Sequence, residues 1–327
     1  MRYPYANLLT MSAAPAPSKK KKALWNVQKI GFIVKHHQPE AAAIAIDLAQ
    51  IALEQGKEVI FASESAPVAQ NLIWELKQRG RKSSLVQTVS KLDVVKKSDV
   101  IIALGGDGTY LSIARLMRER SVPVMGVNMG QLGFLTEFKR SEAVDAIHQI
   151  IRGKMLPIQE RSMLEVTLKR KNKVIFQGPV VNDAVISKGA IARIIGVQIS
   201  TGDKLVNTIR ADGLIISTPT GSTAYSLAAG GPIVEPSLRA LIITPICPHS
   251  LTQRPLVVSD KQEFQFKLMD RAGHVILTLD GQDVIEVEEQ DVISVKRYEK
   301  HSLMLISSPT RDYFGLLREK LKFGLRD

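Results

Sequence analysis

The sequence predicts a two-domain α/β protein, with a parallel sheet in its N-terminal half and a second domain made mostly of β-strands. Three observations support this prediction. Short apolar runs alternate with segments of helical periodicity up to about residue 152. Short strand-like segments separated by turn residues then follow one another through the second half. The length, 327 residues, is enough for two domains with cores of their own.

In the N-terminal half, four apolar runs are predicted to be buried strands, and four stretches with apolar residues at helical spacing are predicted to be helices. Pro39 at the start of the first helix and Gly56 after its end are residue types typical of helix boundaries. The predicted strands are residues 29–34, 57–62, 99–104 and 123–127, and the predicted helices are residues 40–55, 68–79, 110–120 and 142–152. Strands that alternate with helices form a parallel sheet with right-handed crossovers.

In the second half, the segments are short, and several show alternating apolar and polar residues. The predicted strands are residues 162–169, 174–178, 184–187, 196–201, 205–210, 214–218, 240–246, 254–258, 263–268, 274–279 and 291–296. The final segment, residues 312–323, is predicted to be a helix that packs on the first domain. We therefore expect an α/β domain over residues 25–140, completed by residues 306–327, and a β-rich domain over residues 141–305.

Residues 1–24 are expected to form a disordered basic tail. They carry Arg2 and the lysine run 19–22 with no acidic residue, and without these five charges the net charge falls from +12 to +7. A moderately basic surface suits anionic ligands such as nucleotides, and charge alone leaves non-specific RNA contact open. Aromatic residues are only 5% of the chain, which argues against a stacking platform for specific binding of nucleic acid.

The compartment and metal content can also be predicted. Cys247 is the only cysteine, which excludes an internal disulfide and fits a reducing compartment. No apolar run approaches the ~20 residues of a membrane helix, so we expect a cytoplasmic protein with no membrane partner. The six histidines show no metal-ligand spacing, and we expect no structural metal site.

A glycine-rich turn, Gly105-Gly106-Asp107-Gly108-Thr109, lies between a predicted strand and a predicted helix. Ligands of open α/β sheets bind beyond the carboxyl ends of the strands, and helix starts offer free N–H groups to phosphate. Asp107 would repel phosphate unless it holds a divalent cation or accepts a proton from an attacking hydroxyl. A ligand-free Asp-Gly turn is the alternative. The pattern favours a phosphotransferase in which Gly105, Gly106, Gly108 and Thr109 cradle phosphate, although it matches neither the common phosphate loop nor the dinucleotide fingerprint.

Two further clusters are candidate binding loops. Residues 210–226 run from a predicted strand into a stretch rich in hydroxyls and glycine, in which Tyr225 offers a flat face for a base. Asn182-Asp183 places an amide beside a carboxylate, a pair suited to ribose hydroxyls. Ordinary turn chemistry is the alternative for both clusters.

Taken together, these segments resemble the NAD kinase family, whose members phosphorylate NAD to NADP. The resemblance runs from about Lys29 to Gly324. The glycine turn alone also occurs in phosphofructokinases and in diacylglycerol and sphingosine kinases, whereas Thr-Pro-Thr-Gly-Ser-Thr-Ala-Tyr at residues 218–225 is far more specific. The matching segments are residues 105–109, 128–137, 182–183, 212–225, 248–255 and 312–321.

The resemblance implies a Rossmann-like, phosphofructokinase-like first domain, with NAD bound between the two domains. It implies ATP as phosphoryl donor, Mg²⁺ carried by the ATP phosphates, and a homodimer or homotetramer. Asp107 would be the catalytic base. The residues implied to bind NAD are Asp107, Gly108, Asn182, Asp183, Arg193, Arg210, Asp212, Thr223, Ala224, Tyr225, Ser226, Leu227, Ala228 and Gln282.

This chain departs from the family pattern at two of these positions. Ala228 stands where relatives often have serine, which removes one hydrogen bond, and Asp183 stands where many have glutamate, which shortens the reach of the charge. Arg210 resembles the residue of forms that prefer NAD to NADH. Two alternatives remain open: a kinase of the same superfamily that acts on a lipid or sugar, and a non-enzymatic NAD(H) sensor associated with RNA through the lysine tail. Inorganic polyphosphate in place of ATP also stays open.

Overall fold

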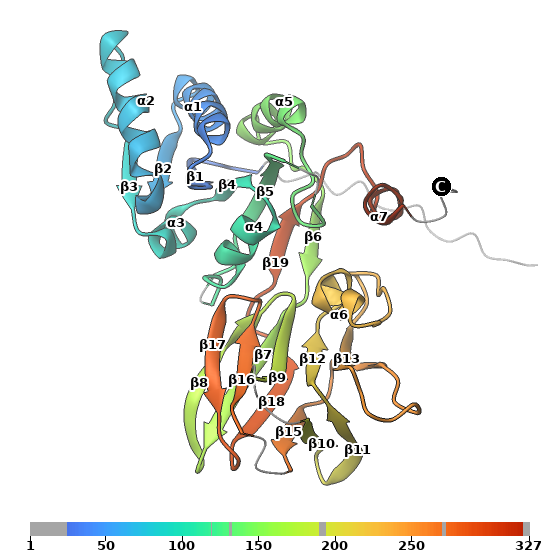
Figure 1. Ribbon diagram of the computed structural model, residues 1–327. Helices are drawn as coiled ribbons and strands as arrows, with labels where there is room; N and C mark the ends of the chain where they lie inside the picture. Colours follow the sequence, from blue (N-terminus) through green and yellow to red (C-terminus); the bar gives the residue numbers. More distant parts are fainter. Residues whose placement is uncertain (1–24, 119, 131–132, 190–193, 270–272, 323–327) are drawn as a thin grey trace, which may run out of the picture.

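The computed structural model describes residues 25–118, 120–130, 133–189, 194–269 and 273–322. It contains two lobes, an α/β lobe and a lobe of antiparallel strands, joined where the chain crosses between them (Figure 1). The predicted fold class is confirmed.

The first lobe is built on a seven-stranded sheet with the order β3-β2-β1-β4-β5-β19-β6. All neighbouring strands are parallel except β6, which runs antiparallel to β19. The strands are β1 (Lys29–Val34), β2 (Glu58–Ala62), β3 (Val86–Val89), β4 (Val100–Gly105), β5 (Pro123–Asn128), β6 (Ile158–Arg161) and β19 (Leu303–Ile306). Apart from Lys29 at the start of β1, the central strands β1 and β4 contain no charged or polar side chain, as expected where helices cover both faces of a sheet.

Buried clusters show which helices cover which face. One cluster joins a sheet face to α1 (Pro39–Glu54), α2 (Ala66–Gln78) and α5 (Arg140–Ile151). The other cluster joins the opposite face to α3 (Lys91–Lys97) and α4 (Asp107–Ala114). Because α5 packs in the first cluster and β6 pairs with β19, the α/β lobe extends past the expected limit at residue 140 to Arg161.

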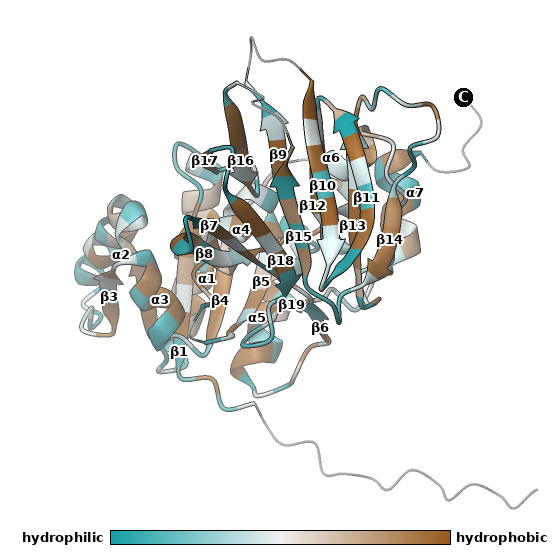
Figure 2. Ribbon diagram, turned by 90° about the horizontal axis from the view of Figure 1, so that it is seen from below, coloured by the Kyte–Doolittle hydropathy of each residue, from teal (hydrophilic) through white to brown (hydrophobic). Residues whose placement is uncertain are grey.

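The second lobe packs two six-stranded sheets against each other. One sheet has the order β11-β10-β15-β18-β7-β8 and the other β14-β13-β12-β9-β16-β17. The strands are β7 (Leu164–Arg170), β8 (Lys173–Val180), β9 (Asp183–Lys188), β10 (Ile195–Thr201), β11 (Lys204–Ala211), β12 (Gly213–Ser217), β13 (Ala240–Ile246), β14 (Leu256–Ser259), β15 (Phe264–Leu268), β16 (Val275–Leu279), β17 (Asp283–Val287) and β18 (Val292–Arg297). Figure 2 shows hydrophobic and hydrophilic bands on these strands, as expected where one face of a sheet is buried.

Several predicted elements need correction. The helix predicted over residues 110–120 is α4, which begins at Asp107 inside the glycine turn and ends at Ala114. The short elements β3, α3, β6, β17 and β19 are among those that were not predicted. The predicted final helix is α7 (Tyr313–Leu321). Asp312 is its N-cap residue, and the Asp312 carboxylate accepts the Gly315 N–H at 2.8 Å. No helix in the described part of the chain is long and apolar enough to cross a membrane. The expected tail, residues 1–24, lies outside the described residues.

Candidate active site

The glycine turn forms the junction between β4 and α4, at the carboxyl edge of the parallel sheet. Gly106 precedes the helix in an extended conformation, with φ −115° and ψ −170°, and its carbonyl accepts the Thr109 N–H at 3.0 Å. A Cβ on Gly105 would overlap the Thr109 side chain, whereas Gly106 and Gly108 face open space. The four predicted cradle residues therefore lie at the start of α4, and the open space beside Gly106 and Gly108 leaves room for a ligand there.

The Asp107 carboxylate is held by the loop that follows β5. Its Oδ2 accepts the Phe134 N–H at 2.8 Å, and its Oδ1 accepts the Leu135 N–H, the Thr136 N–H and the Thr136 hydroxyl, each at 3.1 Å. Three donors on Oδ1 and one on Oδ2 leave Oδ2 as the oxygen with room for another donor. A Cβ on Gly133 would overlap this carboxylate, so glycine is required where the loop approaches it.

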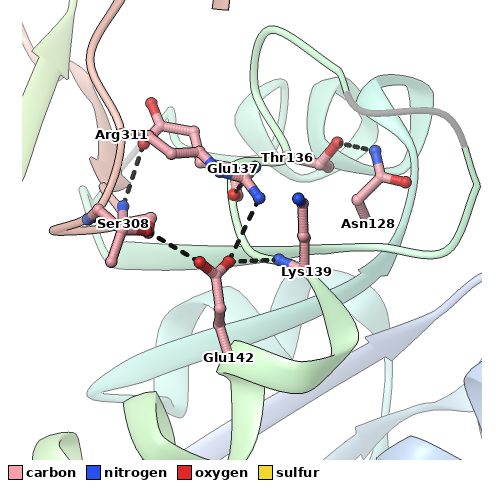
Figure 3. A network of polar contacts seen from close by, with 8 residues as sticks. Asn128, Thr136, Glu137, Lys139, Glu142, Ser308 and Arg311 are labelled. Carbon is pink, nitrogen blue, oxygen red and sulfur yellow. Dashed lines mark hydrogen bonds and ion pairs between the residues drawn. The ribbon is translucent and has the colours of Figure 1, made fainter. Parts of the chain in front are cut away.

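A buried polar network joins the same loop to the chain's last segment (Figure 3). The Glu137 carboxylate accepts the Ser308 N–H at 3.1 Å, and the Arg311 guanidinium donates to the Glu137 carbonyl. Arg311 also pairs with Glu142 of α5 at 3.4 Å. Burial raises the pKa of the Glu137 carboxyl. The network fixes the residue next to Thr136, and so supports the loop that orients Asp107.

The Asn182-Asp183 pair is positioned by a carboxylate about one hundred residues later in the chain. Asp280, at the turn between β16 and β17, accepts the N–H groups of Val181, Asn182 and Asp183 at 2.7 to 3.2 Å. The Thr218 hydroxyl donates a hydrogen bond to the Val181 carbonyl at 2.5 Å. Asp280 was not predicted as a site residue, because its partners are distant in sequence and no local pattern marks it.

A cleft of about 380 Å³ opens at this pair. Its lining residues are Asn182, Asp183, Val185, Ser187, Ala224, Tyr225, Thr278, Asp280 and Gly281. Tyr225 is 48% exposed and Asp183 only 4%. Burial, with the neighbouring Asp280 charge second, raises the pKa of the Asp183 carboxyl to about 7. The cleft thus combines an aromatic face, an amide and a carboxyl that titrates near neutral pH.

Gly221 allows the hydroxyl-rich loop to approach Asn182. A Cβ at this position would overlap the Asn182 carbonyl and lie 2.7 Å from its Cα, and both obstacles are backbone. We expect Gly221→Ala to lower the free energy of unfolding by about 2 kcal/mol, since overpacking typically costs 1–3 kcal/mol. Urea denaturation of Gly221→Ala measures this cost. Gly106→Ala is the control, because a Cβ at Gly106 meets no other atom and its φ is not positive. Equal stability of Gly221→Ala and the unsubstituted protein would contradict it.

One buried cluster lies behind both the glycine turn and the cleft, and it includes residues of both lobes. Val181, next to Asn182, packs in the same buried cluster as Tyr110 of α4 and Leu135 of the Asp107 loop. Arg115, just after α4, donates to the Gln282 side chain at 2.8 Å and pairs with Asp283. The predicted residue Gln282 therefore lies at a contact between the two lobes.

Other predicted residues lie elsewhere. Asp212 pairs with Lys188 at 2.7 Å. The pair lies at the end of β12 that is farther from Asn182. Five residues of strand at about 3.3 Å each put this end, with Arg210 close by, roughly 16 Å from Asn182. Ser226 is fully buried, and its hydroxyl is 2.9 Å from that of Thr244.

Within residues 223–228, only Ala224 and Tyr225 line the cleft, and Thr223, Leu227 and Ala228 do not. The Thr223 hydroxyl donates to the Thr220 carbonyl at 3.2 Å. Arg193 lies outside the described residues. The structure of this chain alone thus assembles Asn182, Asp183, Ala224 and Tyr225 as one group.

Comparisons with known proteins match both lobes. The ATP-NAD kinase N-terminal domain model matches residues 30–155, and the C-terminal domain model matches residues 181–306. The NAD kinase of Geotalea daltonii is 42% identical over 300 residues, which cover 92% of this chain and 100% of the relative. The NAD kinase of Aquifex aeolicus is 43% identical over 229 residues, which cover 70% of this chain and 83% of the relative.

Two solved structures share the architecture. Yeast NADH kinase complexed with NADH is similar with a TM-score of 0.80 and 26% identity, over 92% of this chain and 89% of that chain. An NAD kinase from Archaeoglobus fulgidus in complex with ATP shares the fold with a TM-score of 0.61 and 22% identity, over 89% of this chain and 98% of that chain. With both family domains matched and relatives about as long as the chain itself at about 40% identity, this chain belongs to the NAD kinase family.

Proposed function

We propose that the protein transfers the γ-phosphoryl group of ATP to the 2′-hydroxyl of the adenosine ribose of NAD, forming NADP and ADP. The observation that carries the proposal is the Asp107 carboxylate, whose Oδ2 has room for a hydroxyl donor beside an open glycine cradle. The buried cluster shared by Tyr110 and Val181 joins this acid to the cleft at Asn182-Asp183. Relatives named NAD kinase, and solved relatives in complex with NADH and with ATP, support the choice of substrates.

In this mechanism Asp107 Oδ2 accepts a hydrogen bond from the 2′-hydroxyl and takes its proton as the oxygen attacks the γ-phosphorus. The bond between the γ-phosphorus and the β–γ bridging oxygen breaks, and ADP leaves with that oxygen. Phosphoryl transfer of this kind depends on positioning and charge stabilisation more than on covalent catalysis, which suits a backbone cradle. Asn182 and Asp183 would hold ribose hydroxyls, and Tyr225 would pack against a base.

Magnesium fits this site as an ion carried by the donor. In the described residues, no three His, Cys, Asp or Glu side chains are grouped as metal ligands. Mg²⁺ is commonly bound through substrate phosphates and water with few protein carboxylates, so such a cluster is not needed. When bound, the ion would neutralise charge on the transferring phosphoryl group.

Purified protein incubated with ATP, Mg²⁺ and NAD is expected to form NADP, which a coupled dehydrogenase assay detects. An NADH arm tests the acceptor preference suggested by Arg210. Binding of NAD without NADP formation would favour a sensor. Phosphorylation of a lipid or sugar without NADP formation would favour the wider kinase superfamily.

We also propose a cytoplasmic homo-oligomer. The exposed thiol of Cys247 supports a reducing compartment. Large apolar side chains on the β-rich lobe, such as Leu205 at 61% and Leu251 at 94% exposure, support contact with another copy. Light scattering of the purified protein measures the number of copies, and a monomer at micromolar concentration would contradict the proposal.

A further inference from the structure

We propose that a trough beside the glycine turn, with Lys35 and Lys91 as its principal cations, binds the phosphoanhydride chain of the phosphoryl donor. This inference rests on the proposed function and assigns to the donor a set of side chains separate from those at the dinucleotide cleft. The ligand class is a linear chain of phosphates, whether it belongs to a nucleoside triphosphate or to inorganic polyphosphate.

The trough consists of two adjoining clefts. The first, of about 380 Å³, contains Gly106, Gly108 and Thr109 of the turn together with Lys35 and His36. The second, of about 700 Å³, extends to Arg115 and Gln282 at the contact between the lobes. Both clefts are lined by Glu64, Lys91 and Ser112, so the space is continuous. Volumes of this size are typical of small-ligand sites.

Lys91 lies beside Ser112 of α4, in the cleft that also contains Gly106, Gly108 and Thr109. Its Nζ is 3.5 Å from the Ser112 hydroxyl, which in turn donates to the Thr109 carbonyl at 2.7 Å. Glu64 holds the same Nζ at 2.6 Å, and the Lys91 side chain is only 21% exposed. The ammonium group is therefore fixed within reach of any phosphate that occupies the helix start.

Lys35 lies against the other end of the turn. Its N–H donates to the Leu104 carbonyl at 2.9 Å, and a Cβ on Gly105 would lie 3.2 Å from the Lys35 Cβ. Its backbone is thus anchored at the carboxyl ends of β1 and β4, while its side chain is exposed to the cleft. Across the described ranges, Lys35 has no ion pair with a carboxylate. A phosphate would therefore face no protein carboxylate in competition for this ammonium.

The character of the lining selects the ligand. Lys35, Lys91, Arg115 and Arg118 supply four positive charges, and Glu64 is the one carboxylate among the residues that line the two clefts. Neither lining includes Phe, Tyr or Trp, so neither offers a ring of those types on which adenine could stack. Charge recognition of a phosphate chain, rather than recognition of a base, is what these side chains can provide.

The test compares Lys35→Ala and Lys91→Ala with Lys77→Ala, a control that removes an exposed lysine from the far end of α2. Calorimetry without NAD gives dissociation constants for ATP and for inorganic tripolyphosphate, and steady-state kinetics give KM for ATP and for NAD. Each test substitution is expected to weaken ATP binding about tenfold or more, as loss of a charge-assisted bond does. KM for NAD and the melting temperature should stay unchanged, as should every value for Lys77→Ala.

Lys91→Ala leaves Glu64 without its partner, and repulsion by that carboxylate could mimic loss of the lysine. The double variant Lys91→Ala/Glu64→Gln removes the repulsion, and its ATP binding should remain weakened. Recovery of wild-type affinity in the double variant would remove Lys91 from the site. If the lysine substitutions weaken the binding of ATP alone, the trough binds the phosphate chain of a nucleotide. If they weaken the binding of both ATP and tripolyphosphate, the trough also binds free polyphosphate.

The outcomes separate this inference from the proposed function. If the protein forms NADP while both lysine variants keep wild-type affinity for ATP and tripolyphosphate, the inference is wrong and the function stands. If the wild type binds either probe through these lysines but forms no NADP, the proposed function is wrong and the trough remains a phosphate-chain site.

Discussion

Asp107→Asn is expected to lower kcat by at least ~10²-fold, because a positioned general base contributes ~10²–10⁴-fold. The substitution keeps the shape of the side chain but removes its ability to take the 2′-hydroxyl proton. Affinity for NAD should change little, since the asparagine amide can still hydrogen-bond the 2′-hydroxyl and the cleft at Asn182 and Asp183 is left unchanged. Stopped assays of NADP formation give kcat, and calorimetry gives the dissociation constant for NAD.

The contacts of Asp107 require a control for structural damage. An asparagine can keep Oδ1 toward Leu135 and Thr136, but its amide group would then face the Phe134 N–H, which now donates to Oδ2. Two opposed donors cost about 1–3 kcal/mol of stability if left unsatisfied. Thr136→Val removes one of the four donors and leaves the carboxylate, so its kcat should fall far less. Near-normal turnover in Asp107→Asn would remove Asp107 from the role of base.

Long apolar segments made much of the fold predictable. β1, β4 and β13 were identified because buried strands read as continuous apolar runs. β3 and β19 have only four residues each, too few for periodicity to distinguish them from loops. The start of α4 was placed late because the glycines of the turn have low helix propensity, whereas the Gly106 carbonyl already accepts helical N–H groups.

The candidate site was predictable where one motif supplies both position and chemistry, as in the glycine turn. It was not predictable where a side chain acts through a distant partner. Asp280 holds backbone groups 97 to 99 residues earlier, and Thr136 bonds a carboxylate 29 residues earlier. Asp212 shows the converse limit, because proximity in sequence to a binding loop did not place it at the cleft of this chain.

Asp183→Asn is expected to stabilise the fold at pH 8 while weakening the binding of NAD. The Asp183 pKa of about 7 lies roughly 3 units above its reference value of 3.8, because the side chain is buried beside Asp280. A carboxyl with a raised folded-state pKa favours the folded state fully below pH 4, and that contribution is lost as the pH rises through 7. At 1.36 kcal/mol per unit, ionisation costs up to about 4 kcal/mol at pH 8.

An amide avoids this cost because it carries no charge at any of these pH values. The gain in the free energy of unfolding of Asp183→Asn should therefore be absent near pH 4, grow between pH 4 and 7, and level off above 7. Urea denaturation at pH 5 and at pH 8 measures this difference. Asp203→Asn, at an exposed turn, should show no such gain.

The ionisation of Asp183 that lowers the stability of the fold should strengthen the binding of NAD. A ribose hydroxyl donates more strongly to a carboxylate than to a carboxyl or an amide, so wild-type affinity should fall as the pH decreases through 7. Asp183→Asn should bind NAD about tenfold more weakly at pH 8 and lose that pH dependence. A side chain that costs stability in order to hold substrate is consistent with the known conflict between stability and function at binding sites. Equal stability of the two proteins at pH 8, or wild-type affinity that does not vary between pH 6 and 8, would show that Asp183 does not carry this charge in the cleft.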